Sequence, residues 1–135
     1  MNEKVEQIVE HLKPRSEVSA IWLFGSVAQG KAGVNSDIDI AVLFIDALSP
    51  MERFDLRLEL MNVLEDIAGC AVDVIDMEAA SLFLQHQIRK TGRLLFEEDH
   101  QKRVEFDVRS RRDYFDLEYR YQQRARIIER NALGG

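Results

Sequence analysis

The sequence has few cysteines that could form disulfide bonds and no long apolar run that could anchor it in a membrane. Its 135 residues include one cysteine, Cys70, so no disulfide can form within the chain, which fits a reducing compartment. No apolar run reaches the roughly 18 residues that a membrane-spanning helix needs. Residues 1–12 (MNEKVEQIVEHL) are too polar for a signal peptide. We therefore expect a cytoplasmic protein with no membrane partner.

Positive charge is also scarce. The chain has 18 lysines and arginines against 24 aspartates and glutamates, a net charge of −6. Proteins that bind nucleic acid regardless of its sequence usually carry a positively charged face. No cluster of positive residues is evident before residue 100. General nucleic-acid binding is therefore not expected.

What is present fits one small domain with a helical extension. Hydrophobic residues make up 46% of the chain, enough for a core at this length. Apolar periodicity and turn residues predict helices at residues 2–13, 50–68, 79–90 and 99–131, and strands at 18–24, 38–44, 71–75 and 93–97. This order predicts an α/β fold, a small mixed sheet of about four strands covered by helices. We expect residues 1–98 to form the main domain and residues 99–135 a long C-terminal helical extension.

Two aspartates open the second predicted strand. One residue separates Asp37 from Asp39, so on a strand both side chains point to the same face. Two carboxylates side by side repel each other unless a cation lies between them. Mg²⁺ prefers such oxygen ligands. An Asp-x-Asp pair alone is also compatible with a polar strand entry, so its meaning depends on the residues around it.

The loop before these aspartates can hold phosphate. Gly25 and Ser26 follow the first predicted strand, and Ser26 opens a short stretch, SVAQG, that suits one helical turn. Glycine lets a ligand approach the backbone closely, and a hydroxyl with free backbone N–H groups suits phosphate oxygens. An ordinary turn would explain Gly25 and Ser26 if they stood alone.

A third carboxylate lies in the next predicted strand. Asp73 stands between Val72 and Val74, so its side chain faces away from theirs. If the valines face the core, Asp73 lies on the carboxylate side of the sheet. Three carboxylates around two metal ions can position a nucleoside triphosphate and activate an attacking oxygen.

Together these features resemble a known family. Gly25 and Ser26, ten intervening residues, Asp37-Ile38-Asp39 and the later Asp73 are similar to the nucleotidyltransferase superfamily related to DNA polymerase beta, above all its minimal branch. The resemblance covers roughly residues 18–97. It implies the polymerase beta-like fold, ATP as substrate and two Mg²⁺ ions. Gly25 and Ser26 would contact the triphosphate, and Asp37, Asp39 and Asp73 would bind metal and serve catalysis.

The resemblance also implies a partner. Minimal nucleotidyltransferases are commonly antitoxins paired with a HEPN-domain toxin, an all-helical RNase. It implies transfer of AMP to a tyrosine of that toxin, which neutralises it, within a toxin–antitoxin hetero-oligomer. Two alternatives stay open: a non-catalytic antitoxin that acts by binding, and a nucleotidyltransferase that modifies a small molecule. One departure concerns Gln29, where many relatives carry arginine, and Lys31 is the candidate replacement for that charge.

The last predicted helix has two open interpretations. It combines seven arginines from Arg109 to Arg130 with several tyrosines and phenylalanines. Charged residues at helical spacing usually form a solvated face with i,i+4 ion pairs. Arginine and aromatic residues together favour an interface. Partner contact and simple self-packing both remain possible.

Overall fold

The computed structural model describes residues 2–30 and 37–134. Its elements in chain order are α1 (Glu3–Leu12), β1 (Val18–Phe24), α2 (Gly25–Ala28), β2 (Ile38–Phe44), α3 (Pro50–Ala68), β3 (Val72–Asp76), α4 (Leu82–Thr91), β4 (Arg93–Glu97) and α5 (His100–Gly134). The four predicted strands and the four longer helices are all present. The helical turn expected just after the first strand is also present, as α2.

Two helix boundaries differ from the prediction by three residues: α5 ends at Gly134 and not at residue 131, and α4 starts later than predicted. The apolar pattern predicted a helix from residue 79, but the helix begins at Leu82. Ser81 caps it, because its hydroxyl accepts a hydrogen bond from the N–H of Leu84 at 3.1 Å. The preceding residues instead form a turn around Asp76, whose carboxylate accepts from the N–H of Glu78 at 3.0 Å.

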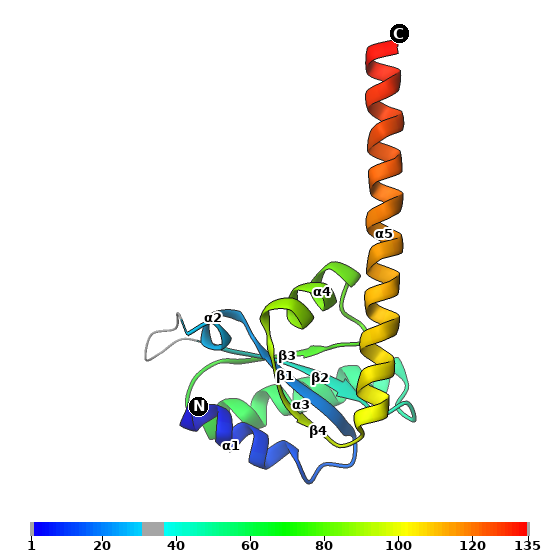
Figure 1. Cartoon of the computed structure of the whole chain (residues 1–135). Helices are drawn as coiled ribbons and strands as arrows, with labels where there is room; N and C mark the ends of the chain where they lie inside the picture. The colour runs from blue at the N-terminus through cyan, green and yellow to red at the C-terminus, as the bar shows by residue number, and fades with distance from the viewer. Residues whose placement is uncertain (1, 31–36, 135) are drawn as a thin grey trace.

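The sheet is mixed, as predicted. Its strand order is β3-β2-β1-β4 (Figure 1). β1 pairs antiparallel with β2 and with β4, whereas β2 pairs parallel with β3. The short connection between β1 and β2 makes them antiparallel neighbours, and the crossover through α3 makes β3 parallel to β2.

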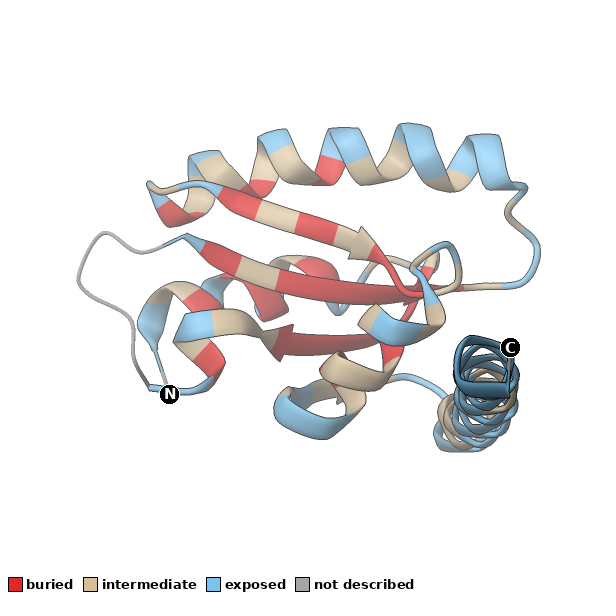
Figure 2. Ribbon diagram, turned by 90° about the horizontal axis from the view of Figure 1, so that it is seen from above, coloured by how far each residue is buried: buried red, intermediate tan, exposed pale blue. Residues whose placement is uncertain are grey.

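Helices cover both faces of this sheet (Figure 2). On one face α1 and α3 bury a core that includes Ile8, Ile40 and Leu64. On the other face α4 and the first turns of α5 cover a smaller core around Trp22 and Phe106. Side chains that alternate along β1 and β2 therefore enter the two cores in turn.

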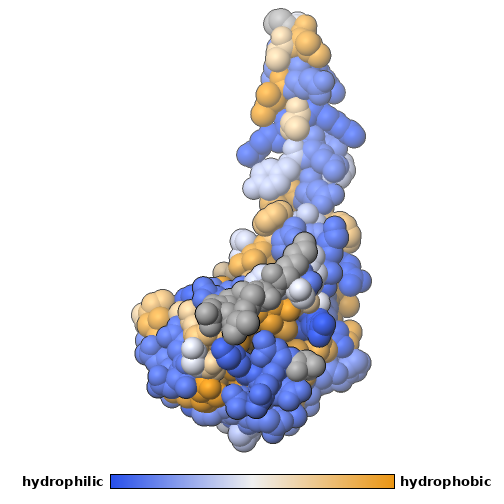
Figure 3. All heavy atoms as spheres, turned by 90° about the vertical axis from the view of Figure 1, so that its left-hand side faces the viewer, coloured by the Kyte–Doolittle hydropathy of each residue, from blue (hydrophilic) through white to orange (hydrophobic). Residues whose placement is uncertain are grey.

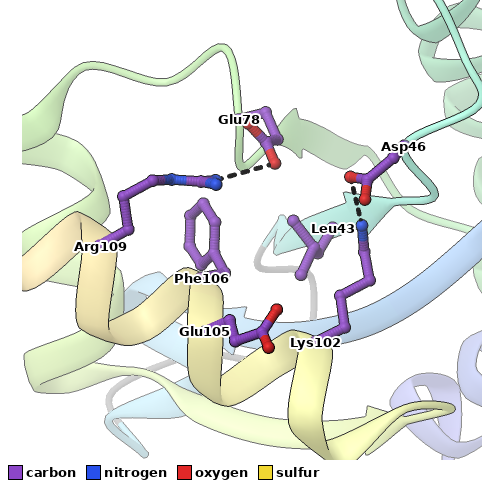
Figure 4. A pocket seen from close by; sticks show the side chains of 7 residues that line it. All are labelled: Leu43, Asp46, Glu78, Lys102, Glu105, Phe106 and Arg109. Atoms are coloured by element: carbon purple, nitrogen blue, oxygen red, sulfur yellow. Dashed lines mark hydrogen bonds and ion pairs between the residues drawn. The ribbon is translucent and has the colours of Figure 1, made fainter.

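Polar contacts fix the base of α5 to the body. Around Phe106, Lys102 Nζ lies 2.5 Å from Asp46 Oδ1 and Arg109 Nη2 lies 3.1 Å from Glu78 Oε1 (Figure 4). These contacts join α5 to the loops that follow β2 and β3. Beyond its base, α5 projects away from the sheet (Figure 1).

Candidate active site

Asp39 and Asp73 lie next to each other on neighbouring strands. They are register partners in the parallel pairing of β2 with β3. Each alternates with buried side chains that face the α1–α3 core, among them Ile40 and Val74. Both carboxylates therefore lie on the opposite face of the sheet, the face that α4 covers. The strand alternation predicted this common side.

Asp37 completes the acidic group. It lies just before β2 and is exposed. Burial raises the pKa of the Asp39 carboxyl above its ordinary value, and the negative charges of Asp73 and Asp37 raise that pKa further. Asp37 and Asp73 are thus close enough to Asp39 for their negative charges to disfavour its ionised form.

Gly25 lies directly against Asp39. Its φ of +76° is in the left-handed region, which glycine adopts without strain. A Cβ at position 25 would overlap Asp39 Oδ2 and stand 3.2 Å from Asp39 Cγ. Phe24, the residue before it, is the register partner of Asp39. The antiparallel pairing of β1 with β2 therefore brings the glycine loop and the acidic group together.

The other loop residues lie around this point. Ser26 is exposed in the single turn of α2, and Gln29 is exposed just after it. Lys31, the candidate replacement for a missing arginine, lies outside the described residues. The structure thus places Gly25, Ser26, Asp37, Asp39 and Asp73 at one end of the sheet.

Sequence reasoning missed one residue at this site. Arg57 of α3 has its Nη2 3.8 Å from Asp73 Oδ1, and its Nε donates a hydrogen bond to the carbonyl of Val74. One helical turn earlier, Arg53 Nε binds Asp76 Oδ2 at 2.7 Å. Two arginines four residues apart thus bind two aspartates three residues apart on β3. That matching is visible in the sequence only once α3 is known to lie beside β3.

The donor set fits a hard cation. Three carboxylates supply only oxygen ligands, which Mg²⁺ prefers. A cation among them would remove the repulsion that raises the pKa of Asp39. Within residues 2–30 and 37–134, no three His, Cys, Asp or Glu side chains are already grouped as a metal site. The fit therefore rests on the chemistry and mutual repulsion of the carboxylates.

Comparisons with known proteins agree with this geometry. Residues 6–101 match the family described as "Polymerase beta, Nucleotidyltransferase". The "Protein adenylyltransferase MntA" of Shewanella oneidensis is 39% identical over 80 residues, which are 59% of this chain and 55% of that protein. The match thus spans about half the length of that curated relative.

Solved structures extend the likeness to α5. A toxin–antitoxin crystal structure with AMP-PNP contains a chain that is 31% identical, with a TM-score of 0.72 over 96% of this chain and 99% of that one. A complex of a tri-AMPylated Shewanella oneidensis HEPN toxin with an MNT antitoxin gives 28% identity and a TM-score of 0.65, covering 93% of each chain. The shared fold and the matched residues 6–101 show that the chain belongs to the polymerase beta nucleotidyltransferase family.

Proposed function

We propose that the chain is a Mg²⁺-dependent protein adenylyltransferase that transfers AMP from ATP to a tyrosine of a cognate HEPN toxin. It would act as the antitoxin by this modification. The observation that carries the proposal is the pairing of Asp39 with Asp73 beside Gly25. Further support comes from the relative named a protein adenylyltransferase and from the similar chains in toxin–antitoxin structures.

The proposed roles follow from position. Asp37, Asp39 and Asp73 would hold two Mg²⁺ ions. Bound Mg²⁺ would neutralise the triphosphate and lower the pKa of the attacking hydroxyl. Gly25 has no Cβ, so a phosphate oxygen can approach the backbone there, and the Ser26 hydroxyl can donate to it.

The transfer itself is a balanced substitution. The tyrosine oxygen forms a bond to the α-phosphorus of ATP, and the bond from that phosphorus to pyrophosphate breaks. Asp73 would accept the proton of the tyrosine hydroxyl or help to bind the second ion, and Arg57, with Nη2 3.8 Å from Asp73 Oδ1, would help to orient it. We expect the proposed reaction to take place in the cytoplasm, where ATP is available, within a toxin–antitoxin hetero-oligomer.

The test is mass spectrometry of the partner. The purified chain, ATP, Mg²⁺ and the cognate HEPN toxin should give the toxin the added mass of one or more AMP units. Asp39→Asn should lower the rate by roughly 100-fold or more. Asp55→Asn, an exposed aspartate on α3, is the matched control and should not change it. A toxin that stays unmodified, or that Asp39→Asn modifies as fast as the wild type, would overturn the proposal.

A further inference from the structure

A small hollow lies at the edge of the sheet, beside Asp73. In the part of the chain that the structure describes, β3 is the last strand on one side of the sheet. The hollow, of about 190 Å³, lies between β3, the turn that follows it and the first turn of α4. Its lining residues are Arg57, Ile75, Asp76, Ala79, Ala80 and Leu84.

The hollow shares a sheet face with the proposed catalytic carboxylates. Ile75 follows Asp73 by two residues on β3 and packs against the core around Trp22. Alternation along the strand therefore puts both side chains on the face that α4 covers. Two residues span about 6.6 Å along a strand, which is comparable with the length of a phenol side chain. A ring seated against Ile75 can thus bring its hydroxyl to the carboxylate of Asp73.

The charged groups that line the hollow are already paired. Asp76 Oδ2 accepts a hydrogen bond from Arg53 Nε at 2.7 Å, and Asp76 Oδ1 accepts one from the N–H of Glu78 at 3.0 Å. The Nε of Arg57 donates to the carbonyl of Val74. An uncharged ligand therefore fits this hollow better than an ion does, because an ion would lose its hydration without gaining a free partner.

The remaining walls suit an aromatic ring. Ile75, Ala79, Ala80 and Leu84 present aliphatic side chains to the hollow. The planar guanidinium of Arg57 can stack on the face of a ring. By contrast, the end of the body that carries α2 is mostly hydrophilic, with small hydrophobic patches (Figure 3). The hollow thus offers a ring apolar contacts that a hydrophilic surface lacks.

The order of the strands indicates which aromatic group would enter. Gly25 and Ser26, which are proposed to contact the triphosphate, follow β1, whereas Asp73 lies on β3, with β2 between them. In such a displacement the attacking oxygen and the leaving pyrophosphate lie roughly in line, on opposite sides of the phosphorus. Pyrophosphate held at the end of β1 therefore leaves the β3 side for the attacking hydroxyl, and the hollow lies on that side.

The adenine base of ATP fits the hollow less well. Adenine carries hydrogen-bonding nitrogens around its edge, and the aliphatic walls formed by Ala79, Ala80 and Leu84 would leave these nitrogens unsatisfied. A phenol ring has one polar atom, at the end that would point out of the hollow toward Asp73. The chemistry of the walls therefore favours a phenol over a nucleobase.

We propose that the hollow binds the aromatic ring of the acceptor tyrosine. The ring would lie between Ile75 and Leu84, under the guanidinium of Arg57, and its hydroxyl would point toward Asp73. A serine or threonine hydroxyl would be too short to reach Asp73 from such a position, so the hollow selects tyrosine. That the bound residue receives AMP rests on the proposed function, whereas the affinity of the hollow for a phenol ring does not.

The first test measures binding of a free phenol to the full chain without ATP. The probe is N-acetyltyrosinamide, followed by NMR of the methyl groups of Ala79, Ala80 and Leu84. We expect roughly millimolar affinity, with the largest shifts at these three residues. N-acetylserinamide, which lacks the ring, should leave the three signals unchanged. Adenosine, the probe for a base site, should bind there at least about tenfold more weakly.

Matched variants locate the site. Ala79→Phe adds a ring at an exposed turn on the rim of the hollow and should weaken binding of N-acetyltyrosinamide about tenfold or more. Ala47→Phe makes the same change in the exposed turn after β2 and should bind like the wild type. With the toxin as acceptor, Ala79→Phe should lower kcat/KM for the toxin about tenfold or more and leave the KM for ATP unchanged. Circular dichroism checks that both variants are folded.

Four outcomes would overturn the inference. They are a lack of saturable binding of N-acetyltyrosinamide, binding that Ala79→Phe leaves unchanged, tighter binding of adenosine at the same methyl groups, and a toxin that Ala79→Phe modifies as fast as the wild type does. Because the probe experiments use no ATP, a chain that transfers no AMP would contradict the proposed function and leave the probe result standing. AMP transfer without probe binding would contradict the hollow alone.

Discussion

At the residue scale, the site depends on one close approach. Gly25 has a left-handed backbone, and its Cα stands so near Asp39 that no side chain fits between them. Position 25 therefore requires glycine for two reasons, the left-handed backbone and the lack of space for a Cβ. Gly30 has a similar φ of +70° but nothing within 4 Å of its would-be Cβ. An alanine at position 30 would therefore strain the backbone alone, whereas an alanine at position 25 would strain the backbone and also displace Asp39.

Gly25→Ala should therefore damage the site more than Gly30→Ala. Each alanine costs about 1–2 kcal/mol for its left-handed backbone. Only Gly25→Ala also pushes Asp39 aside, so we expect it to lower AMP transfer by roughly 100-fold, with little effect from Gly30→Ala. Urea unfolding and transfer rates measure the two effects. Equal rates for both variants would contradict the role of the contact.

Asp39→Asn should make the protein more stable in the absence of divalent cations. The pKa of Asp39 is raised in the folded state, so its stabilising contribution is present below the unfolded pKa and is lost as the pH rises through the folded pKa. At pH 7 the ionised carboxylate is therefore unfavourable, and asparagine removes that cost.

Scanning calorimetry in EDTA measures this effect. We expect the Tm of Asp39→Asn to rise by about 1–3 °C at pH 7, and the gain to disappear as the pH falls below about 4. Asp55→Asn should leave the Tm unchanged. A lower Tm for Asp39→Asn at pH 7 would show that the carboxylates do not repel one another as described.

At the scale of the elements, a small buried polar network joins α5 to α4. Ser110 donates to Gln85 Oε1 at 2.7 Å and accepts from Arg89 Nε at 3.1 Å. Gln85 Nε2 in turn donates to the carbonyl of Met77 at 2.9 Å. Ser110 is 2% exposed and Gln85 6% exposed. Water cannot reach their polar atoms, so these hydrogen bonds are the ones that satisfy them.

Ser110→Ala should consequently destabilise the fold by about 1–3 kcal/mol, because Gln85 and Arg89 each lose a buried partner. The free energy of unfolding in urea measures this. Ser16→Ala, at an exposed position, serves as the control and should change it by less than about 0.5 kcal/mol. A similarly small change for Ser110→Ala would mean that the network does not hold the two helices together.

The elements also show what the sequence could and could not predict. The two-residue period of β2 and β3 correctly predicted that Asp39 and Asp73 share a face. The start of α4 was missed because the apolar pattern extends past Ser81, and only the cap decides the boundary. Ser110 and Arg57 could not be assigned, because polar residues at helical spacing look solvated until the neighbouring element is known.

At the scale of the whole molecule, the chain combines an acidic body with a basic projecting helix. The buried residues of α5, Phe106 and Ser110, both lie in its first third. Residues 119–134 are exposed apart from the half-buried Gln123. The outer half of α5 therefore contributes little to the folding of the body.

Deleting residues 119–135 should leave the body folded. Since these residues contribute almost no burial, we expect a single cooperative unfolding transition and a Tm within about 2 °C of the full chain. Scanning calorimetry measures this, and a truncated chain that no longer unfolds cooperatively would contradict the prediction.

The most direct test of the central claim is calorimetric titration of the full chain with AMP-PNP, in Mg²⁺ and in EDTA. If Asp37, Asp39 and Asp73 bind the metal that holds the triphosphate, affinity should be roughly micromolar in Mg²⁺. It should fall at least about tenfold in EDTA or in Asp39→Asn. Equal affinity with and without Mg²⁺, unchanged by Asp39→Asn, would mean that the carboxylates take no part in binding the nucleotide.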